Sequence, residues 1–123
     1  MLTLPVRRTV VFYRTEKGRC PVADFLDLMP PKVAQKMAWV LKLVQDLDIV
    51  PSQYIKKLTA TDEIWECRVV FGGNTYRILA FFHGKNQMVL THGFMKKTPK
   101  TPLQEMEEAQ RLRTDYLRRQ GNA

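Results

Sequence analysis

The sequence predicts a single α+β domain in which helices cover one face of a small antiparallel sheet. Its 123 residues are the usual length of one domain, and 45% of them are hydrophobic, which is enough to build a core. The predicted elements follow the order β-α-α-β-β-β-α, with a glycine-rich turn between two strands in the second half. We therefore expect residues 1–123 to form one domain, with two N-terminal helices on one face of the sheet and a further helix at the C-terminus.

One strand and two helices are predicted in the first half of the chain. Residues 8–14 favour a strand because they contain consecutive β-formers. Pro21 stands where a first-turn proline belongs, and Pro30-Pro31 ends that helix and can begin the next. The second helix has an apolar stripe of Val33, Met37, Val40 or Leu41, Val44 and Leu47. Its lysines are interpreted as a solvated surface, and they are Lys32, Lys36 and Lys42.

The second half predicts a run of antiparallel strands. Residues 64–71 and 75–82 flank Gly72-Gly73-Asn74, which is a strong hairpin signal. A second turn at residues 83–86 leads into a last strand at residues 88–94.

The final helix has a predicted start and end. Thr101 is expected to cap it, with Pro102 in the first turn and Gln104 completing a capping box. Acidic residues near its start and basic residues near its end match the helix dipole, and they are Glu105, Glu107, Glu108, Arg118 and Arg119.

Strand periodicity brings two arginines together on one face of the predicted sheet. An even-numbered hairpin loop places Arg68 beside Arg77, whereas a three-residue loop would separate them. Like charges opposite each other on neighbouring strands are destabilising, so we expect an anion or a carboxylate between them, and Glu66 is that carboxylate. The alternative is an arginine–glutamate lattice that binds no ligand. The opposite face is assigned to the core, with Trp65, Cys67, Val69 and Phe71.

A basic segment follows the last predicted strand. Between residues 85 and 101 there are four lysines and no acidic residue. His92 is a candidate proton carrier, although a lone histidine on a strand is more often only hydrogen-bonded. Phe94 either stacks on a nucleic-acid base or packs under the final helix. The lysines near the end of the strand are candidate phosphate ligands, and they are Lys96, Lys97 and Lys100.

The composition favours an anionic partner. A formal net charge of +8 favours nucleic acid or an acidic protein, and the alternative is a basic protein without such a partner. Cys20 and Cys67 have no metal-binding spacing with each other or with the two histidines, so we expect no metal and no other cofactor. No signal-peptide core and no stretch approaching the ~20 apolar residues of a membrane span is found, so we expect a cytoplasmic protein without a membrane partner.

The second half carries three motifs in a fixed order. They are Glu66-Cys67-Arg68 in one strand, Tyr76-Arg77 in the next, and Gly-Phe-Met-Lys-Lys-Thr at residues 93–98, before a helix that begins with Thr101-Pro102. Together with the order of the elements, they resemble the phage-derived HigB-type toxins of the RelE superfamily. That family has Glu-Leu-Arg, Tyr-Arg and Gly-Phe-x-Lys-Lys-Thr at the corresponding places. The resemblance implies a RelE-like fold.

The same resemblance implies a small bacterial toxin that cleaves mRNA, typically on the translating ribosome. A cognate antitoxin, often a helix-turn-helix protein, would neutralise it. Members of the superfamily that use two lysines carry them on the strand that corresponds to residues 64–66. This chain has Ile64 and Glu66 there, so that version of the site is absent. Cys67 replaces the common leucine, which is a change within the core.

A metal-independent RNA cleavage site is the resulting hypothesis, since no cluster of metal-binding carboxylates is visible in the sequence. Arg68 and Arg77 would hold the scissile phosphate, because a guanidinium group matches it with two hydrogen bonds. Glu66 is the candidate base, and His92 or Lys97 is the candidate acid. Flanking phosphates or ribosomal RNA would be bound by Lys96, Lys97, Lys100, Lys56 and Lys57.

Two other functions stay open at this point. The chain could be a non-catalytic binding module whose basic face binds an acidic antitoxin segment or nucleic acid. A DNA-binding regulator is less favoured, because Pro30-Pro31 rather than a glycine-containing turn joins the two early helices.

Overall fold

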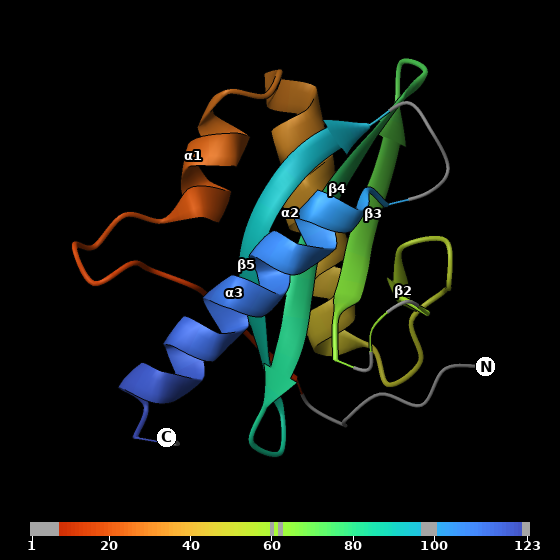
Figure 1. Cartoon of the computed structure of the whole chain (residues 1–123). Coiled ribbons are helices and arrows are strands. Elements are labelled where there is room, and N and C mark those ends of the chain that lie inside the picture. The colour runs from red at the N-terminus through yellow and green to blue at the C-terminus, as the bar shows by residue number, and fades with distance from the viewer. Residues whose placement is uncertain (1–7, 60, 62, 97–100, 122–123) are drawn as a thin grey trace.

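The computed structural model describes residues 8–59, 61, 63–96 and 101–121. Five strands form one sheet in the order β1-β5-β4-β3-β2 (Figure 1). The elements in chain order are β1 (Thr9–Phe12), α1 (Pro21–Asp27), α2 (Pro31–Asp46), β2 (Ile55–Lys57), β3 (Trp65–Phe71), β4 (Asn74–His83), β5 (Gln87–Lys96) and α3 (Leu103–Arg119). The predicted α+β fold is confirmed.

Helices cover both faces of the sheet. Figure 1 shows α2 behind the sheet and α3 in front of it. On the α2 side, Val22 of α1 and Met37 of α2 share a core with sheet residues such as Cys67. On the α3 side, Met106 shares a second core with Phe81. The face of the hairpin that carries the arginines is therefore partly core as well, which the sequence did not predict.

Two features of the sheet differ from the prediction. β1 pairs in parallel with β5, so the sheet is mixed and not purely antiparallel. β2 is a three-residue strand in a segment for which no strand was predicted, and it pairs antiparallel with β3. Local patterns could not reveal either feature. The partner of β1 lies far along the chain, and a three-residue strand is too short to show alternation.

The β3–β4 hairpin has the register that an even-numbered loop predicts. Gly72 and Gly73 have φ angles of 59° and 80°, and this tight turn needs positive φ at both positions. Phe71 pairs with Asn74, and Arg68 consequently lies directly opposite Arg77. Of the two arrangements that the sequence left open, the structure has the one that brings the two arginines together.

A bulge in β5 sets which side chains face α3. Ile78 pairs with Gly93 and Ala80 pairs with Leu90, so Thr91 and His92 together lie opposite the single residue between Ile78 and Ala80. The extra residue reverses the alternation along β5. His92 consequently faces α3, while Gly93 lies under α1, where a Cβ atom would come within 2.3 Å of the Phe25 ring.

The start of α3 differs from the predicted capping box. Pro102 is the N-cap residue, and no side chain caps the helix. Thr101 donates its hydroxyl hydrogen to Glu66 Oε1 on β3 instead. A buried carboxylate that needs a donor competes with the local cap for this hydroxyl. The charged residues agree with the prediction, with Glu105 in the first turn and Arg118 and Arg119 in the last.

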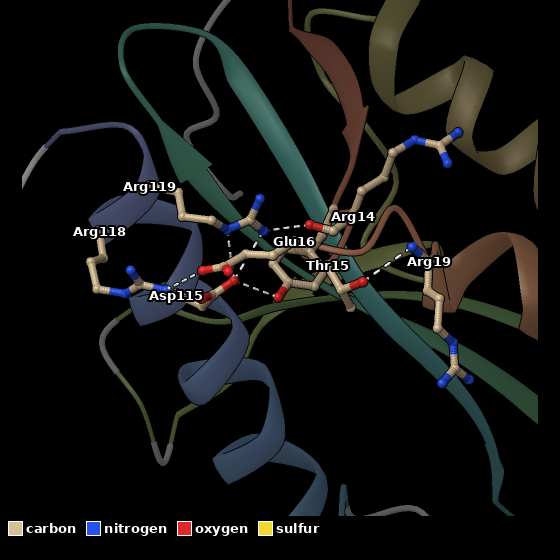
Figure 2. A network of polar contacts seen from close by, with 8 residues as sticks. Arg14, Thr15, Glu16, Arg19, Asp115, Arg118 and Arg119 are labelled. Carbon is tan, nitrogen blue, oxygen red and sulfur yellow. Dashed lines mark hydrogen bonds and ion pairs between the residues drawn. The ribbon is translucent and has the colours of Figure 1, made fainter.

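The far end of α3 is fixed to the segment that follows β1 (Figure 2). Tyr13 donates a hydrogen bond of 2.7 Å to Asp115 Oδ2, and Arg119 lies 2.9 Å from the same oxygen. Arg118 bonds the other oxygen at 2.7 Å and also reaches Glu16 at 2.9 Å. Arg119 donates further to a backbone carbonyl of the same segment. These contacts hold one end of α3, and the other end lies beside the candidate site.

Candidate functional site

The centre of the site is a buried ion pair between β3 and β4. The exposed fractions of Glu66 and Arg77 are 0% and 1%, and Arg77 Nε lies 3.7 Å from Glu66 Oε1. Arg77 Nη1 donates a hydrogen bond of 3.5 Å to Thr101 Oγ1, whose own hydrogen goes to Glu66. Glu66 Oε2 has no hydrogen-bond partner among the described residues. Desolvated charges are costly unless they are paired, so each of these two residues requires the other.

Arg68 differs from Arg77 although the two are directly opposite each other. It is half-buried, and within the described ranges its side chain has no ion pair and no hydrogen bond. Its charge is therefore available to an anion, whereas the charge of Arg77 is opposed by Glu66. Two guanidinium groups in adjacent positions repel each other, and only one of them has an internal counter-charge here.

Two lysines extend the positive charge on the same face of the sheet. Lys56 lies opposite Glu66, and Lys96 lies opposite Thr75, two residues from Arg77 on β4. Residues directly opposite each other on antiparallel strands point to the same face, so both lysines face the same side as Arg68. Both are half-buried and unpaired within the part of the chain that the structure describes. We call Lys56, Arg68 and Lys96 the basic strip.

His92 lies on β5, on the same face of the sheet as the ion pair, and makes polar contacts with both ring nitrogens. Nδ1 is 3.1 Å from Thr91 Oγ1, and Nε2 is 3.0 Å from Glu105 Oε1 on α3. Its ring stacks on Phe94 at 6.0 Å between centroids. Glu105 and Thr91 were not predicted as site residues, because a first-turn glutamate in a helix is explained by the helix dipole alone. Only the position of α3 over the bulge reveals their connection to His92.

The structure brings some of the predicted site residues together and separates others. Phe94 is 9% exposed and packs in the core under α3, which is the second of its two predicted roles. Lys57 is exposed but lies opposite Trp65, on the α2 side of the sheet. Lys97 and Lys100 lie outside the described residues. The remaining candidates share the face of the sheet that α3 covers, and they are Lys56, Glu66, Arg68, Arg77, His92 and Lys96.

Neither cysteine is arranged for chemistry. Both are buried and free. Burial, with a smaller contribution from Glu66, raises the pKa of the Cys67 thiol to about 12, so no thiolate forms near neutral pH. The residue is a small apolar member of the core on the α2 side.

The described residues contain neither a cluster of metal ligands nor a helix suited to a membrane. No three histidine, cysteine or acidic side chains lie close enough together there to hold a metal ion. None of the described helices has the length and apolar character needed to cross a membrane.

The candidate site combines half-buried cations, a buried carboxylate and a histidine held by a second carboxylate. Such a set can bind an anion and has groups able to move protons.

Comparison with known proteins gives one family. The family model described as phage-derived protein Gp49-like (DUF891) matches residues 24–114, which include the ion pair, the basic strip, His92 and Glu105. No curated protein matches the chain. The family is RelE-like and toxin-like, which agrees with the broader part of the resemblance seen in the motifs. Because the match covers most of its length, the chain belongs to the family of phage-derived Gp49-like proteins.

Proposed function

We propose that this protein is the toxin of a toxin–antitoxin pair and that it cleaves mRNA on the translating ribosome. The observation that carries the proposal is the pairing of Arg68 with Arg77, because Glu66 opposes the charge of the buried arginine only. A guanidinium group that has no acidic partner among the described residues fits an anionic ligand, and it matches phosphate with two hydrogen bonds. Membership of a toxin-like family supports RNA as the source of that phosphate.

Metal-independent RNA cleavage requires three contributions from the protein. A base removes the proton of the ribose 2′-hydroxyl, cations stabilise the phosphate as the 2′-oxygen attacks phosphorus, and an acid protonates the departing 5′-oxygen. In this proposal, Arg68 holds the scissile phosphate, and the buried Arg77 on the neighbouring strand contributes further positive charge. Lys56 and Lys96 bind the flanking phosphates. Glu66 is the base and His92 is the acid, with Lys97 as the alternative acid.

Both proton-transfer groups have internal contacts that RNA must replace. Glu66 is fully buried and its Oε1 accepts a hydrogen bond from Thr101, while His92 Nε2 is bonded to Glu105. We expect the contact between Thr101 and Glu66 to open when RNA binds, so that the 2′-hydroxyl can reach the carboxylate.

A Glu66→Gln variant tests the role of the base. The change keeps the shape of the side chain and removes its ability to accept the proton. We expect the rate of mRNA cleavage to fall roughly 10²- to 10⁴-fold, the usual contribution of general base catalysis. RNA affinity should change much less. The melting temperature should fall, because the change removes the buried carboxylate that opposes the charge of Arg77, so cleavage and affinity are measured on the same preparation at a temperature where the variant is folded. Near-normal cleavage would remove Glu66 from the mechanism.

An Arg68→Ala variant tests the phosphate site without leaving a buried charge unpaired. Induction of the wild-type chain in bacteria is expected to arrest growth and to create discrete new 5′ ends in a reporter mRNA, seen by primer extension. Arg68→Ala should lose both effects while remaining soluble. Arg19→Ala removes an exposed arginine from the segment before α1 and is the matched control, which should stay toxic. A soluble wild-type chain that does not arrest growth would contradict the toxin function.

The partners follow from this function. A cognate antitoxin of the helix-turn-helix type would neutralise the toxin, whose targets would be mRNA and the ribosome in the cytoplasm. The net charge of +8 would attract the protein to a polyanionic particle such as the ribosome.

A non-catalytic binding module is the second candidate. It is favoured by the internal contacts of the site, because Glu66 is paired with Arg77 and His92 is bonded to Glu105. Such a module would use the basic strip to bind nucleic acid or an acidic antitoxin segment. Growth arrest without new 5′ ends in the mRNA would favour this function over cleavage.

A further inference from the structure

A line of exposed side chains on α2 combines positive charge with a tryptophan. Lys32, Lys36 and Trp39 are separated by four and three residues, so they share one side of the helix. All three are exposed, and Trp39 has 47% of its surface in solvent. Tryptophan is usually well buried, so an exposed indole between solvated residues requires an explanation.

The contacts of this line show where it lies on the molecule. Lys36 Nζ donates a hydrogen bond of 3.1 Å to the carbonyl oxygen of Val70 on β3. The Trp39 ring meets Tyr54 edge to face, with 5.4 Å between centroids and 89° between planes. The line therefore runs beside β3 on its outer side, next to the start of β2.

Tyr54 connects this line to the basic strip. Its ring touches Trp39, and its carbonyl oxygen accepts a hydrogen bond of 2.8 Å from the backbone N–H of Arg68. β2 pairs with β3 only from Trp65 to Cys67, so Arg68 lies where the edge strand ends. Its side chain points to the α3 side, whereas Trp39 lies on the α2 side. Positive charge and aromatic surface thus continue around one edge of the sheet.

We propose that Trp39 stacks on a base of single-stranded RNA that passes around this edge from the basic strip, while Lys32 and Lys36 bind its phosphates. The proposal rests on the proposed function for the identity of the ligand. A basic path combined with an aromatic side chain on which a base can stack is the usual arrangement for single-stranded nucleic acid. Charge complementarity and continuity with the phosphate site favour RNA over a protein partner. The flanking nucleotides of the bound strand, not only the scissile phosphate, then contribute to affinity.

Binding of a non-cleavable RNA tests the proposal. A fluorescently labelled single-stranded RNA with 2′-O-methyl riboses keeps the bases and phosphates but blocks attack by the 2′-oxygen. Trp39→Ala should weaken its binding roughly 5- to 150-fold, which corresponds to the loss of one aromatic–base stack. Trp39→Phe keeps a stacking ring and should retain most of the affinity. Leu28→Ala removes a hydrophobic side chain that is 82% exposed after α1, and it should bind like the wild type.

Two further readouts separate stacking from a general effect on the fold. The chain has two tryptophans, and the other one, Trp65, is partly buried and packs on Phe82. RNA should therefore quench the tryptophan fluorescence of the wild type through Trp39, and this quenching should be lost in Trp39→Phe. Lys32→Ala should reduce the slope of log affinity against log salt by about 0.7, the value for one phosphate contact on a single strand.

The outcomes distinguish this inference from the proposed function. If Trp39→Ala binds RNA like Leu28→Ala while Arg68→Ala binds weakly, the inference is wrong and the phosphate site stands. If Trp39→Ala keeps RNA binding but loses its antitoxin, the surface belongs to a protein partner and the inference is wrong. If the wild-type chain binds no RNA at all, the inference and the RNA-directed function fail together.

Discussion

Asp115 shows how a single side chain ties two distant segments together. Its carboxylate is bonded to Tyr13 after β1 and to Arg118 and Arg119 on its own helix. These contacts, with the Tyr13 hydrogen bond as the largest contribution, lower the pKa of Asp115 from 3.8 to about 2. A carboxylate with a lowered pKa in the folded state contributes stability that is present above its unfolded pKa. That stability is lost as the pH falls through the folded pKa.

Replacement of Asp115 by asparagine should therefore have a pH-dependent cost. We expect Asp115→Asn to lower the free energy of unfolding at neutral pH, and we expect the difference from the wild type to shrink as the pH falls from 3.8 towards 2. Urea denaturation at a series of pH values measures this difference. Asp27→Asn changes an exposed aspartate at the end of α1 and is the control. A difference that stays constant down to pH 2 would contradict the assignment.

The residues of the candidate site differ in how far the sequence could predict them. The Arg68–Arg77 pair depends only on the length of one hairpin loop, which the sequence left open between an even number and three residues, and the pairing of Phe71 with Asn74 decides it. Thr101, which bonds Glu66, and Glu105, which bonds His92, both lie at the start of α3. Their positions depend on where α3 packs over the sheet, and no local pattern contains that information.

At the scale of elements, β5 shows why a single glycine is needed. The bulge turns His92 towards α3 and leaves Gly93 against the ring of Phe25 on α1. Gly93→Ala would place a Cβ atom 2.3 Å from Phe25 Cδ2, so α1 or β5 would have to shift. We expect a loss of about 1–3 kcal/mol in the free energy of unfolding, the usual cost of overpacking a core.

Urea denaturation of Gly93→Ala measures this loss of stability, and a double variant provides a check. Phe25→Leu in the Gly93→Ala background removes part of the ring and should recover part of the lost stability, because the two changes share one contact. A Gly93→Ala variant as stable as the wild type would show that α1 does not pack tightly on this strand.

The sequence predicted elements better than it predicted their partners. The helices begin at the predicted prolines or directly after one, because proline at a helix start acts through its own backbone geometry. The parallel pairing of β1 with β5 and the short β2 were missed, since both depend on strands elsewhere in the chain. The capping box also failed for a tertiary reason, because Thr101 bonds Glu66.

At the scale of the whole molecule, the distribution of charge is more informative than its size. The net charge of +8 is evident from the sequence but does not locate a site. In the structure, the arginines towards the end of α3 are paired with acidic residues, as in the contacts of Arg118 and Arg119 with Asp115. The basic strip at the other end of α3 has no such partners within the described ranges. The positive charge of the basic strip is therefore available to an external anion.

The hydrogen bond from Lys36 to Val70 has a consequence for behaviour at high concentration. Beyond the short β2, no described strand pairs with the outer side of β3, and such an edge can recruit the same edge of another molecule. Lys36 engages one carbonyl there and places a charge beside it, which opposes strand-to-strand aggregation. An RNA strand bound along α2 would cover this edge, so the occupied protein should also be the less aggregation-prone one.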